Sequence, residues 1–398
     1  MAKQSAIPFK EVKPVVIGAA GAYDVARVQR LDVPVNLPTT DIDELGNYLH
    51  AGQVTDLPEV SGTIQAMDVS AKLYAALIGT AYASFTSSDI SNLSNIDFVA
   101  EIKSDTISDI AKSLHVRKAK ISGFTYTYSI DGEATEEYTF QATEKRWLKY
   151  DVVVEDLGTT GTSLSLANTP ITLKNTHKLL SFIVDGTYWT EVADGAVLTS
   201  NQYSVSGTTV TLFSSPATAS IAVYHFNATN DWTYISDSTI PAAIRGKNVT
   251  VALKAANVNR VQSVTIRGTF PTTPVKEMGT TSIIAYVDGV PSVEGDISVL
   301  DTDTELIALF ATGEVTPADV EFNICEFTSS GISLEVVLYD PALDCNLPIA
   351  SGTVQKTIYI AGITITSEGH STNVGGQATQ TFGFKSTLGD CAVYKGAK

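Results

Sequence analysis

An internal repeat constrains the fold of this chain more than any other feature of its sequence. Residues 25–75 match residues 258–308 at a shift of 233 positions without a gap, and 17 of the 51 positions are identical. Ordinary amino-acid usage predicts roughly 3 identities by chance. The shared residues include the prolines at Pro38 and Pro271 and the glycines at Gly62 and Gly295. The chain is therefore expected to contain two copies of one β-rich unit.

Each copy is predicted to consist mainly of strands. Residues 58–67 alternate between apolar and polar side chains, and so do the equivalent residues 291–300. This period of two residues is typical of a strand that buries one face and exposes the other to water. Further strands are expected at residues 27–37, 96–104, 118–130 and 135–144 of the first copy and at residues 320–327, 357–366 and 379–385 of the second.

One short helix is expected after the alternating strand of each copy. Asp68 or Ser70 is positioned to cap the first helix, and Gly79 would end it. The second helix would begin at a capping box formed by Thr302 and Glu305. The buried side of each helix would consist of residues spaced i, i+3 and i+4, namely Leu73, Ala76 and Leu77 in the first copy and Leu306, Leu309 and Phe310 in the second.

The shift between the two copies grows toward their ends. It is 233 positions in the first part of each copy, 239 where Ile121 is matched to Ile360, and 244 where Tyr138 is matched to Phe382. The sequence therefore predicts two insertions in the second copy. The first would lie at residues 340–353 and the second in a hairpin tip at residues 369–376.

A segment outside the repeat separates the two copies. It contains a Gly-, Thr- and Ser-rich stretch at residues 158–165 and then short β-patterned runs, which are typical of a small β-sandwich. The predicted fold is mainly β, and each copy would form a sandwich or barrel with one short helix. The first copy is placed at residues 1–147, the inserted β-sandwich module at residues 148–241 and the second copy at residues 242–398.

Charge and hydropathy exclude several classes of partner. The net charge of −17 is spread over the three parts as −6, −5 and −6. Tight nucleic-acid binding requires Lys and Arg side chains that neutralise phosphates, so this distribution argues against it. It does not argue against nucleic acid that passes without being bound. Residues 1–14 lack the apolar core of a signal peptide, so assembly in a cytosol and no membrane partner are expected.

No group of residues in the sequence resembles an active site. The five histidines are scattered without metal-ligand spacing, and no phosphate-binding glycine loop occurs. Cys325, Cys345 and Cys391 also lack metal-ligand spacing, and we expect free thiols in a reducing compartment. No enzymatic activity, cofactor or metal is therefore expected.

Carboxylates recur on the polar face of the repeated strand. The first copy has Glu59 on this face, whereas the second copy has Glu294 and Asp296. Two interpretations remain open. The face is simply solvated, or it forms the acidic lining of a shared space.

The order of these motifs resembles that of the major tail tube proteins of long-tailed bacteriophages. It runs through a strand, a Pro-Thr-Thr turn, a long loop with Glu-Leu-Gly, a strand reading Leu-Pro-Glu-Val-Ser-Gly-Thr-Ile, a short helix and a hairpin. The resemblance covers residues 9–147 and again residues 242–395. It is to the subset with a duplicated fold, which forms trimeric rings of pseudo-sixfold symmetry and often carries an immunoglobulin-like decoration domain. The position of the module between the copies departs from that pattern.

The resemblance implies a virion protein, assembled in the host cytoplasm, whose stacked rings form a tail tube that conducts double-stranded DNA without binding it tightly. The implied partners are further copies of the chain, the tail tape measure protein, the tail terminator and baseplate or tail-tip proteins. The implied lumen-lining residues are Glu59, Ser61, Thr63, Gln65, Asp97, Glu101, Glu294, Asp296, Ser298 and Glu321. The implied stacking loops, residues 38–57 and 271–290, place Thr40, Asp41, Glu44, His50, Thr273, Lys276, Glu277 and Thr281 between rings.

Strand geometry favours six copies per ring. The resemblance implies about four inner strands per copy, and strands lie roughly 4.8 Å apart and tilt by about 40°. Six copies then give about 24 strands and an opening of about 38 Å after roughly 10 Å is subtracted for side chains. A ring of four copies would leave about 22 Å, which is too narrow for hydrated duplex DNA. Three double-copy chains are therefore expected per ring.

Two other functions remain open. The chain could be the inner-tube subunit of a contractile injection system that carries protein effectors. Alternatively, it could be a β-sandwich adhesin that binds carbohydrate through Tyr188, Trp189 and Trp232, although such aromatic residues more often belong to a core.

Overall fold

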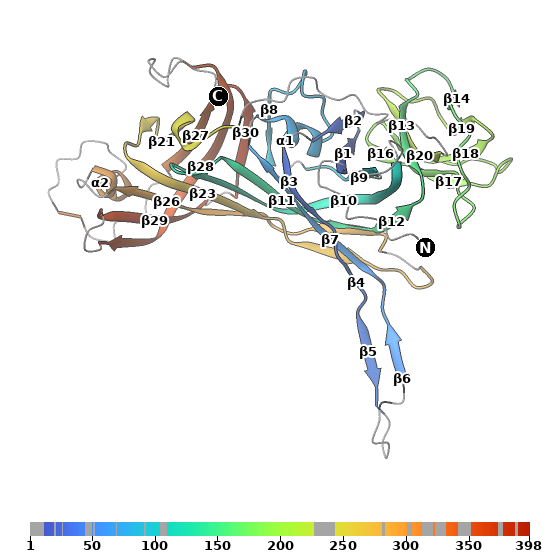
Figure 1. Cartoon of the computed structure of the whole chain (residues 1–398), viewed down its shortest axis with the longest axis horizontal. Helices are drawn as coiled ribbons and strands as arrows, with labels where there is room; N and C mark the ends of the chain where they lie inside the picture. Colours follow the sequence, from blue (N-terminus) through green and yellow to red (C-terminus); the bar gives the residue numbers. More distant parts are fainter. Residues whose placement is uncertain are drawn as a thin grey trace.

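The computed structural model describes residues 12–19, 21–25, 27–43, 50, 52–68, 70–90, 93–103, 110–226, 243–280, 283–300, 305–312, 321–322, 332–340, 352–372, 377–386 and 389–398. The chain is mainly β, as predicted, with the first copy in the centre of Figure 1, the inserted module on the right and the second copy on the left. The first copy contains β1 (Val12–Gly18), β2 (Gly21–Asp24), β3 (Val28–Asp32), β4 (Val35–Asn36), β5 (Thr39–Ile42), β6 (Gly52–Thr55), β7 (Glu59–Met67), α1 (Lys72–Leu77), β8 (Ser87–Asp89), β9 (Ile96–Lys103), β10 (Ile110–Ser129), β11 (Thr135–Ala142) and β12 (Glu144–Leu148).

The remaining elements follow the same chain order. The module contains β13 (Asp151–Asp156), β14 (Ser163–Ser165), β15 (Leu179–Val184), β16 (Thr187–Tyr188), β17 (Thr190–Val192), β18 (Gln202–Ser206), β19 (Thr209–Leu212) and β20 (Ser220–Phe226). The second copy contains η3 (Gly246–Asn248), β21 (Val249–Leu253), β22 (Ala256–Asn257), β23 (Val261–Thr269), β24 (Thr272–Val275), β25 (Ala285–Asp288), β26 (Ser292–Leu300), α2 (Glu305–Thr312), β27 (Ile332–Tyr339), β28 (Val354–Ser371), β29 (Thr379–Ser386) and β30 (Cys391–Lys395).

The repeat in the sequence is a repeat in the structure. Strands β7 and β26 have the same alternation of buried and partly exposed residues along all nine positions, as predicted. Their partners β3 and β23 carry a register shift at equivalent places, after Val28 and after Val261. The residue before each shift, Arg27 and Arg260, has a positive φ, at 56° and 59°. The duplication therefore extends to backbone irregularities.

The second half of each copy corrects the predicted alignment. Leu114 of β10 pairs with Ala100 of β9, and Ile358 of β28 pairs with Val336 of β27, so β9 corresponds to β27 and not to residues 320–327. The positive-φ residues of the long strands, Lys118 and Gly362, likewise lie 244 positions apart. The match of Ile121 to Ile360 and the second insertion at residues 369–376 are therefore wrong, because the full shift is already reached at the start of β28.

Each copy is a sandwich of two sheet layers in which one long strand takes part in both. The first half of β10 lies between β9 and β12, and its second half lies between β11 and β23. The strand β28 plays the same role in the second copy. One hydrophobic core runs through both copies. A Cβ atom on Gly62 would lie 2.2 Å from the ring of Phe140, which explains why a glycine is needed within this alternating strand.

The first helix differs from the prediction at its start. The N-cap residue of α1 is Ala71, and no side-chain hydrogen bond caps the helix there. The backbone N–H of Lys72 donates to Ser70 Oγ at 3.4 Å. Asp68 does not cap the helix, because its carboxylate is fully buried between other partners described below. The end of the helix is as predicted, with Gly79 at a φ of 72°. Thr302 lies outside the described residues.

The inserted module is a sandwich of two four-stranded sheets that is docked firmly on the first copy. One face of the sheet β13-β20-β15-β16 packs on the second sheet of the module, β14-β19-β18-β17. The opposite face packs on the first copy, where Ile183 and Val223 meet Val15 and Ile17 of β1. The second copy has the exposed Lys254 at the position equivalent to Ile17, so this apolar docking surface is not repeated there.

Replacement of Ile183 by Ala should destabilise the protein by about 2–4 kcal/mol, because this residue is 2% exposed in the contact between module and first copy. The free energy of unfolding, measured by denaturant titration, checks this value. The matched control Val197→Ala, at a residue that is 91% exposed, should change it by less than about 0.5 kcal/mol. Equal effects of the two substitutions would contradict a docked module.

Candidate assembly site

The two copies are joined by continuous strand pairing. Strand β10 of the first copy pairs with β23 of the second over seven residue pairs, from Gly123↔Thr269 to Ser129↔Ser263. The last strand of the chain, β30, returns to pair with β8 of the first copy. We call these contacts between copies the junction. They place eight strands side by side in the order β3-β7-β11-β10-β23-β26-β29-β28.

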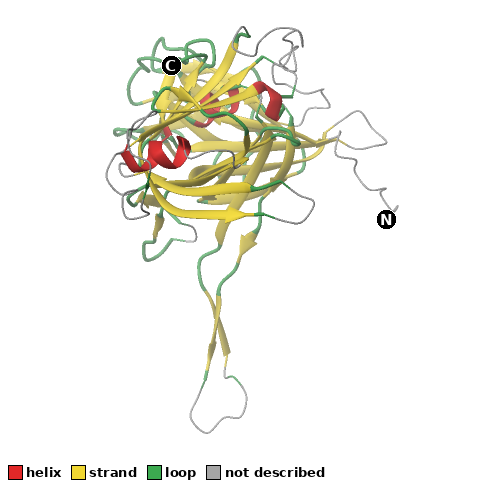
Figure 2. Ribbon diagram, turned by 90° about the vertical axis from the view of Figure 1, so that its left-hand side faces the viewer, coloured by secondary structure: helices red, strands yellow, loops and turns green. Residues whose placement is uncertain are grey.

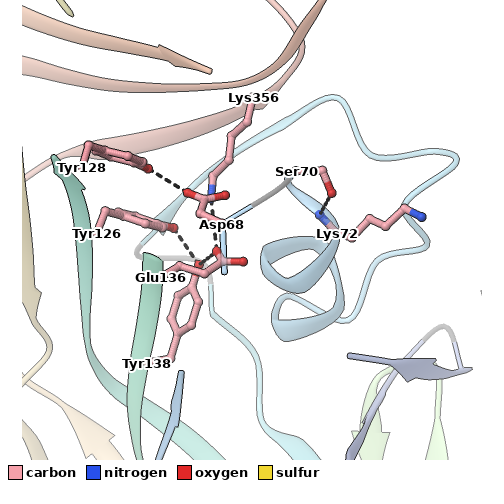
Figure 3. Close-up of polar contacts among 8 residues, drawn as sticks. All are labelled: Asp68, Ser70, Lys72, Tyr126, Tyr128, Glu136, Tyr138 and Lys356. Carbon is pink, nitrogen blue, oxygen red and sulfur yellow. Dashed lines mark hydrogen bonds and ion pairs between the residues drawn. The ribbon is translucent and has the colours of Figure 1, made fainter. Parts of the chain in front are cut away.

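A buried ionic cluster crosses the junction (Figure 3). The ammonium of Lys356, on β28 of the second copy, lies 2.9 Å from Asp68 Oδ2 and 3.1 Å from Glu136 Oε2 of the first copy. Lys356 and Asp68 are fully buried, and Glu136 is 2% exposed. Tyr128 donates to Asp68 at 2.7 Å. Removal of one partner would leave a buried charge uncompensated, so this cluster specifies how the copies meet.

The charges of the cluster are set by burial. Burial raises the pKa of Glu136 to about 8, even though the adjacent Lys356 acts to lower it. For Lys356, burial acts to lower the pKa, but Asp68 and Glu136 outweigh it and raise that pKa above its ordinary value. Burial therefore favours the protonated form of Glu136 beside the lysine. The second copy has Gln380 at the position equivalent to Glu136. The glutamine amide resembles the protonated carboxyl in shape and carries no charge.

A hairpin of the second copy strengthens the junction. The β24–β25 hairpin lies against the first copy, where Lys120 Nζ is 2.6 Å from Asp288 Oδ2 and Lys276 Nζ is 3.0 Å from Asp56 Oδ2. Just before this hairpin, Phe270 is 8% exposed and its ring centroid lies 5.8 Å from that of Phe124. The hairpin therefore adds ion pairs and an aromatic contact between the two copies at the end of the junction.

The equivalent hairpin of the first copy has a different position. Strands β5 and β6 form an arm that extends away from the body of the molecule (Figures 1 and 2). Leu37, the residue equivalent to Phe270, is 59% exposed at its base. Ile42 and Val54 on the arm are 43% and 54% exposed. The apolar side chain at the base of the hairpin is thus buried in the second copy, as Phe270, and exposed in the first, as Leu37.

The predicted stacking residues lie mainly on these two hairpins. Thr40, Asp41 and His50 are exposed on the arm, where His50 Nδ1 lies 2.5 Å from Asp43 Oδ1. Thr273, Lys276 and Glu277 are exposed at the β24–β25 hairpin. Glu44 and Thr281 lie outside the described residues.

The polar face of the eight-stranded sheet contains most of the predicted lining residues. On this face lie Glu59, Ser61, Thr63, Gln65, Glu294, Asp296 and Ser298, each of them at least partly exposed. One row of paired residues crosses all eight strands and reads Arg30, Gln65, Glu137, Thr125, Arg267, Glu294, Lys385 and Thr364. Bases are thus interleaved with the acids on this face. Arg267 Nη1 lies 2.8 Å from Asp296 Oδ2, and Arg30 Nη2 lies 3.1 Å from Asp32 Oδ2.

Two predicted lining residues have another role. Asp97 and Glu101 are fully buried, so the prediction that they line a lumen is wrong. The module covers this side of β9, where Tyr188 donates to Asp97 Oδ1 at 2.8 Å and His115 Nε2 lies 2.9 Å from Asp97 Oδ2. Burial acts to raise the pKa of Asp97, but the ion pair with His115 outweighs it and leaves that pKa below its ordinary value. Glu321 is exposed and lies in neither described helix nor strand.

The important residues that sequence reasoning missed are Lys356 and its partners. Lys356, Ile358 and Ile360 are spaced by two residues, so they lie on the same face of the strand. The lysine is therefore a charged residue on an otherwise apolar face. That signal, together with an aspartate retained in the repeat at Asp68, could have revealed a buried pair. Within the described ranges, no group of three or more His, Cys, Asp or Glu residues could hold a metal ion.

Neither the module nor the described helices offer another kind of site. Trp189 is 6% exposed within the core of the module, and Tyr188 is committed to Asp97, so the proposed carbohydrate platform is wrong for these two residues. Trp232 lies outside the described residues. None of the helices that the structure describes has the length and apolar character needed to cross a membrane. Cys391 is buried as a free thiol.

Comparison with known proteins finds similarity among solved structures. No family model matches the chain, and no curated protein matches it. Among solved structures, it is similar to a chain of an extracellular contractile injection system, the PVC sheath–tube complex in the extended state. The similarity has a TM-score of 0.27 at 12% sequence identity and covers 36% of this chain and 92% of the other.

Substitution of Glu136 by Gln should remove a pH dependence of stability. Because the folded-state pKa is about 8 and lies above the ordinary value of 4.5, the wild-type chain loses stability as pH rises between these values. The slope can reach about 1.4 kcal/mol per pH unit. Denaturant titrations between pH 5 and pH 8.5 should show this decline in the wild type and a flatter profile in Glu136→Gln. The neighbouring Glu137→Gln, on the partly exposed face, should keep the wild-type slope; identical slopes in all three proteins would contradict the assignment.

Proposed function

We propose that this protein is a structural tube subunit that assembles with further copies of itself into closed rings, and that these rings stack. The observation that carries the proposal is the junction. The chain contains one complete contact between its first and second copies, and each end of the eight-stranded sheet presents one half of the same contact.

The two ends of the sheet are complementary strand edges. The half of β28 that pairs with β29 has no second partner strand among the described residues, whereas the equivalent half of β10 is paired with β23. At the other end, β3 pairs only with β7 in the part of the chain that the structure describes, whereas its equivalent β23 pairs on both sides. Unpaired edges attract further strands, so β28 of one chain should pair with β3 of the next. We call this contact the seam.

The junction predicts the register of the seam. Thr127 pairs with Thr265 at the junction, and their equivalents across the repeat are Ser371 and Asp32. The backbone N–H of Ser61 donates to the carbonyl of Pro34, so this proline faces β7 and leaves the outer edge of β3 intact. The seam therefore has the hydrogen-bonding capacity of the junction.

Three chains close the ring. Each chain contributes eight strands, so three chains give about 24 strands and the opening of about 38 Å derived above. The polar face of the sheet would line this opening. It combines Ser, Thr and Gln side chains with paired charges, which suits passage of a charged polymer without tight binding. We propose double-stranded DNA of a bacteriophage as the cargo, with tape measure, terminator and tail-tip proteins as further partners in the virion.

The arm of the first copy would lie between neighbours. At the junction, the β24–β25 hairpin lies on the adjacent copy, so the β5–β6 arm should lie on the adjacent chain or the adjacent ring once these are present. Its exposed residue Leu37 would then be covered, as its equivalent Phe270 is at the junction. Apolar side chains exposed on a hairpin are typical of a surface that binds a partner.

A disulfide can test both the assembly and the register. The double variant Asp32→Cys, Ser371→Cys should form covalent dimers and trimers on mild oxidation, because directly opposed residues lie about 4.5–5.5 Å apart. The control Asp32→Cys, Glu368→Cys is displaced by three residues, about 10 Å, and should form none. Non-reducing gel electrophoresis measures the products.

Electron microscopy and native mass measurement test the function itself. Negatively stained wild-type protein should show rings or tubes with a mass of three chains per ring. A chain that remains monomeric at all concentrations, even with a tail initiator complex, would overturn the proposal. Cross-linking in the control variant alone would overturn the register but not the ring.

A further inference from the structure

One exposed tryptophan has no explanation in the isolated chain. Trp147, on β12, is 56% exposed. The ammonium of Lys112 lies 4.9 Å from the centre of the indole, and that of Lys145 lies 5.7 Å from it. A large aromatic side chain held in place by two cations is costly to expose and is typical of the centre of a protein interface.

The second copy shows what this surface looks like when it is covered. Trp147 pairs with Leu114, and its equivalent Val393 pairs with Ile358. Lys112 lies two residues before Leu114, as Lys356 lies two residues before Ile358. Val393 and Lys356 are both fully buried. The same two positions are therefore exposed in the first copy and buried in the second.

The cover of the second-copy positions comes from the first copy. Strand β8 pairs with β30 there, with Ser88 opposite Val393. Tyr74 and Leu77 of α1 belong to the same buried core as Val393. Asp68 and Glu136 receive the ammonium of Lys356. The covering surface thus consists of one short helix, one edge strand and a carboxyl pocket.

We infer that Lys112 and Trp147 insert into the equivalent surface on the second copy of the neighbouring chain. This inference rests on the proposed function, because it requires that a second chain be present. The covering surface would consist of α2 and the end of β29 that carries Gln380. The direction agrees with the seam, since the chain whose β28 pairs with β3 of its neighbour also receives Lys112 and Trp147 of that neighbour.

The receiving surface supplies a carboxylate for Lys112. Gln380 replaces Glu136, but its Nε2 donates to Glu368 Oε1 at 2.9 Å, so an acid on β28 lies next to this position. Gln380 is 5% exposed, and Glu368 is partly exposed. The lysine of the junction binds two carboxyls, whereas the lysine of the seam would bind Glu368 beside a neutral amide. The partner is therefore a second copy of this chain, matched to Lys112 in charge.

Two substitutions test this contact. Trp147→Ala and Lys112→Glu should each raise the protein concentration needed for ring assembly at least tenfold, as measured by sedimentation velocity. Both residues are exposed in the isolated chain, so the midpoint of denaturant unfolding of the monomer should stay unchanged. The matched controls are Phe213→Ala, at an aromatic residue that is 51% exposed on the module, and Lys254→Glu, at an exposed residue on the outer face of the second copy; both should assemble like the wild type.

A charge exchange identifies the partner residue. The double variant Lys112→Glu, Glu368→Lys restores an opposite pair at every seam, so its assembly should recover at least threefold relative to Lys112→Glu alone. Acrylamide quenching of tryptophan fluorescence gives an independent measurement. The contribution of Trp147 is the part of the quenching that the Trp147→Phe variant lacks. This part should disappear when wild-type rings form. Assembly of Trp147→Ala and Lys112→Glu at the wild-type concentration would overturn the inference while leaving the ring intact. A wild-type chain that never assembles would overturn the proposed function itself.

Discussion

The pairing of β10 with β23 is the interaction on which the rest of the structure depends. A sheet edge presents N–H and C=O groups that must find partners, and this pairing satisfies one pair of edges within the chain. Because both strands belong to copies of one unit, the pairing leaves behind the complementary edges of β3 and β28. The chain therefore contains the junction, and the proposed seam would pair these two edges in the same way. Its geometry is self-complementary in the head-to-tail sense, which generates either a closed ring or an open filament.

Divergence between the copies has assigned different tasks to equivalent surfaces. The outer face of the first copy has Val15 and Ile17 and binds the module, whereas the second copy has the exposed Lys254 in the same place. Val393 became a small core residue at the junction, whereas Trp147 stays exposed. A single-copy subunit could not make these distinctions, because every contact in its ring would be identical.

The sequence predicts this fold well where its signal is local. The strands β7 and β26 follow from a period of two residues, and Gly79 ends α1 through its positive φ. The failures arise from tertiary contacts that leave no periodic signal. Asp97 alternates like a solvated residue but is buried beneath the module, whose Tyr188 lies 91 positions later in the chain. The match of Ile121 to Ile360 rested on local similarity between two alternating stretches, and only the strand pairing and the bulge shared at Lys118 and Gly362 show that the shift is 244.

The polar face shows how a strongly acidic protein can present an almost balanced wall. The net charge is −17, yet the row that crosses the eight strands contains Arg30, Arg267 and Lys385 among its acids. A uniformly basic wall would bind phosphates, and a uniformly acidic wall would oppose the entry of DNA over roughly a Debye length of about 10 Å. Opposite charges on adjacent strands cancel within that distance and leave a hydroxyl-rich surface. In the proposed ring, such a wall would exert little net force on a polyanion, so the proposed cargo would pass without binding tightly to the lining.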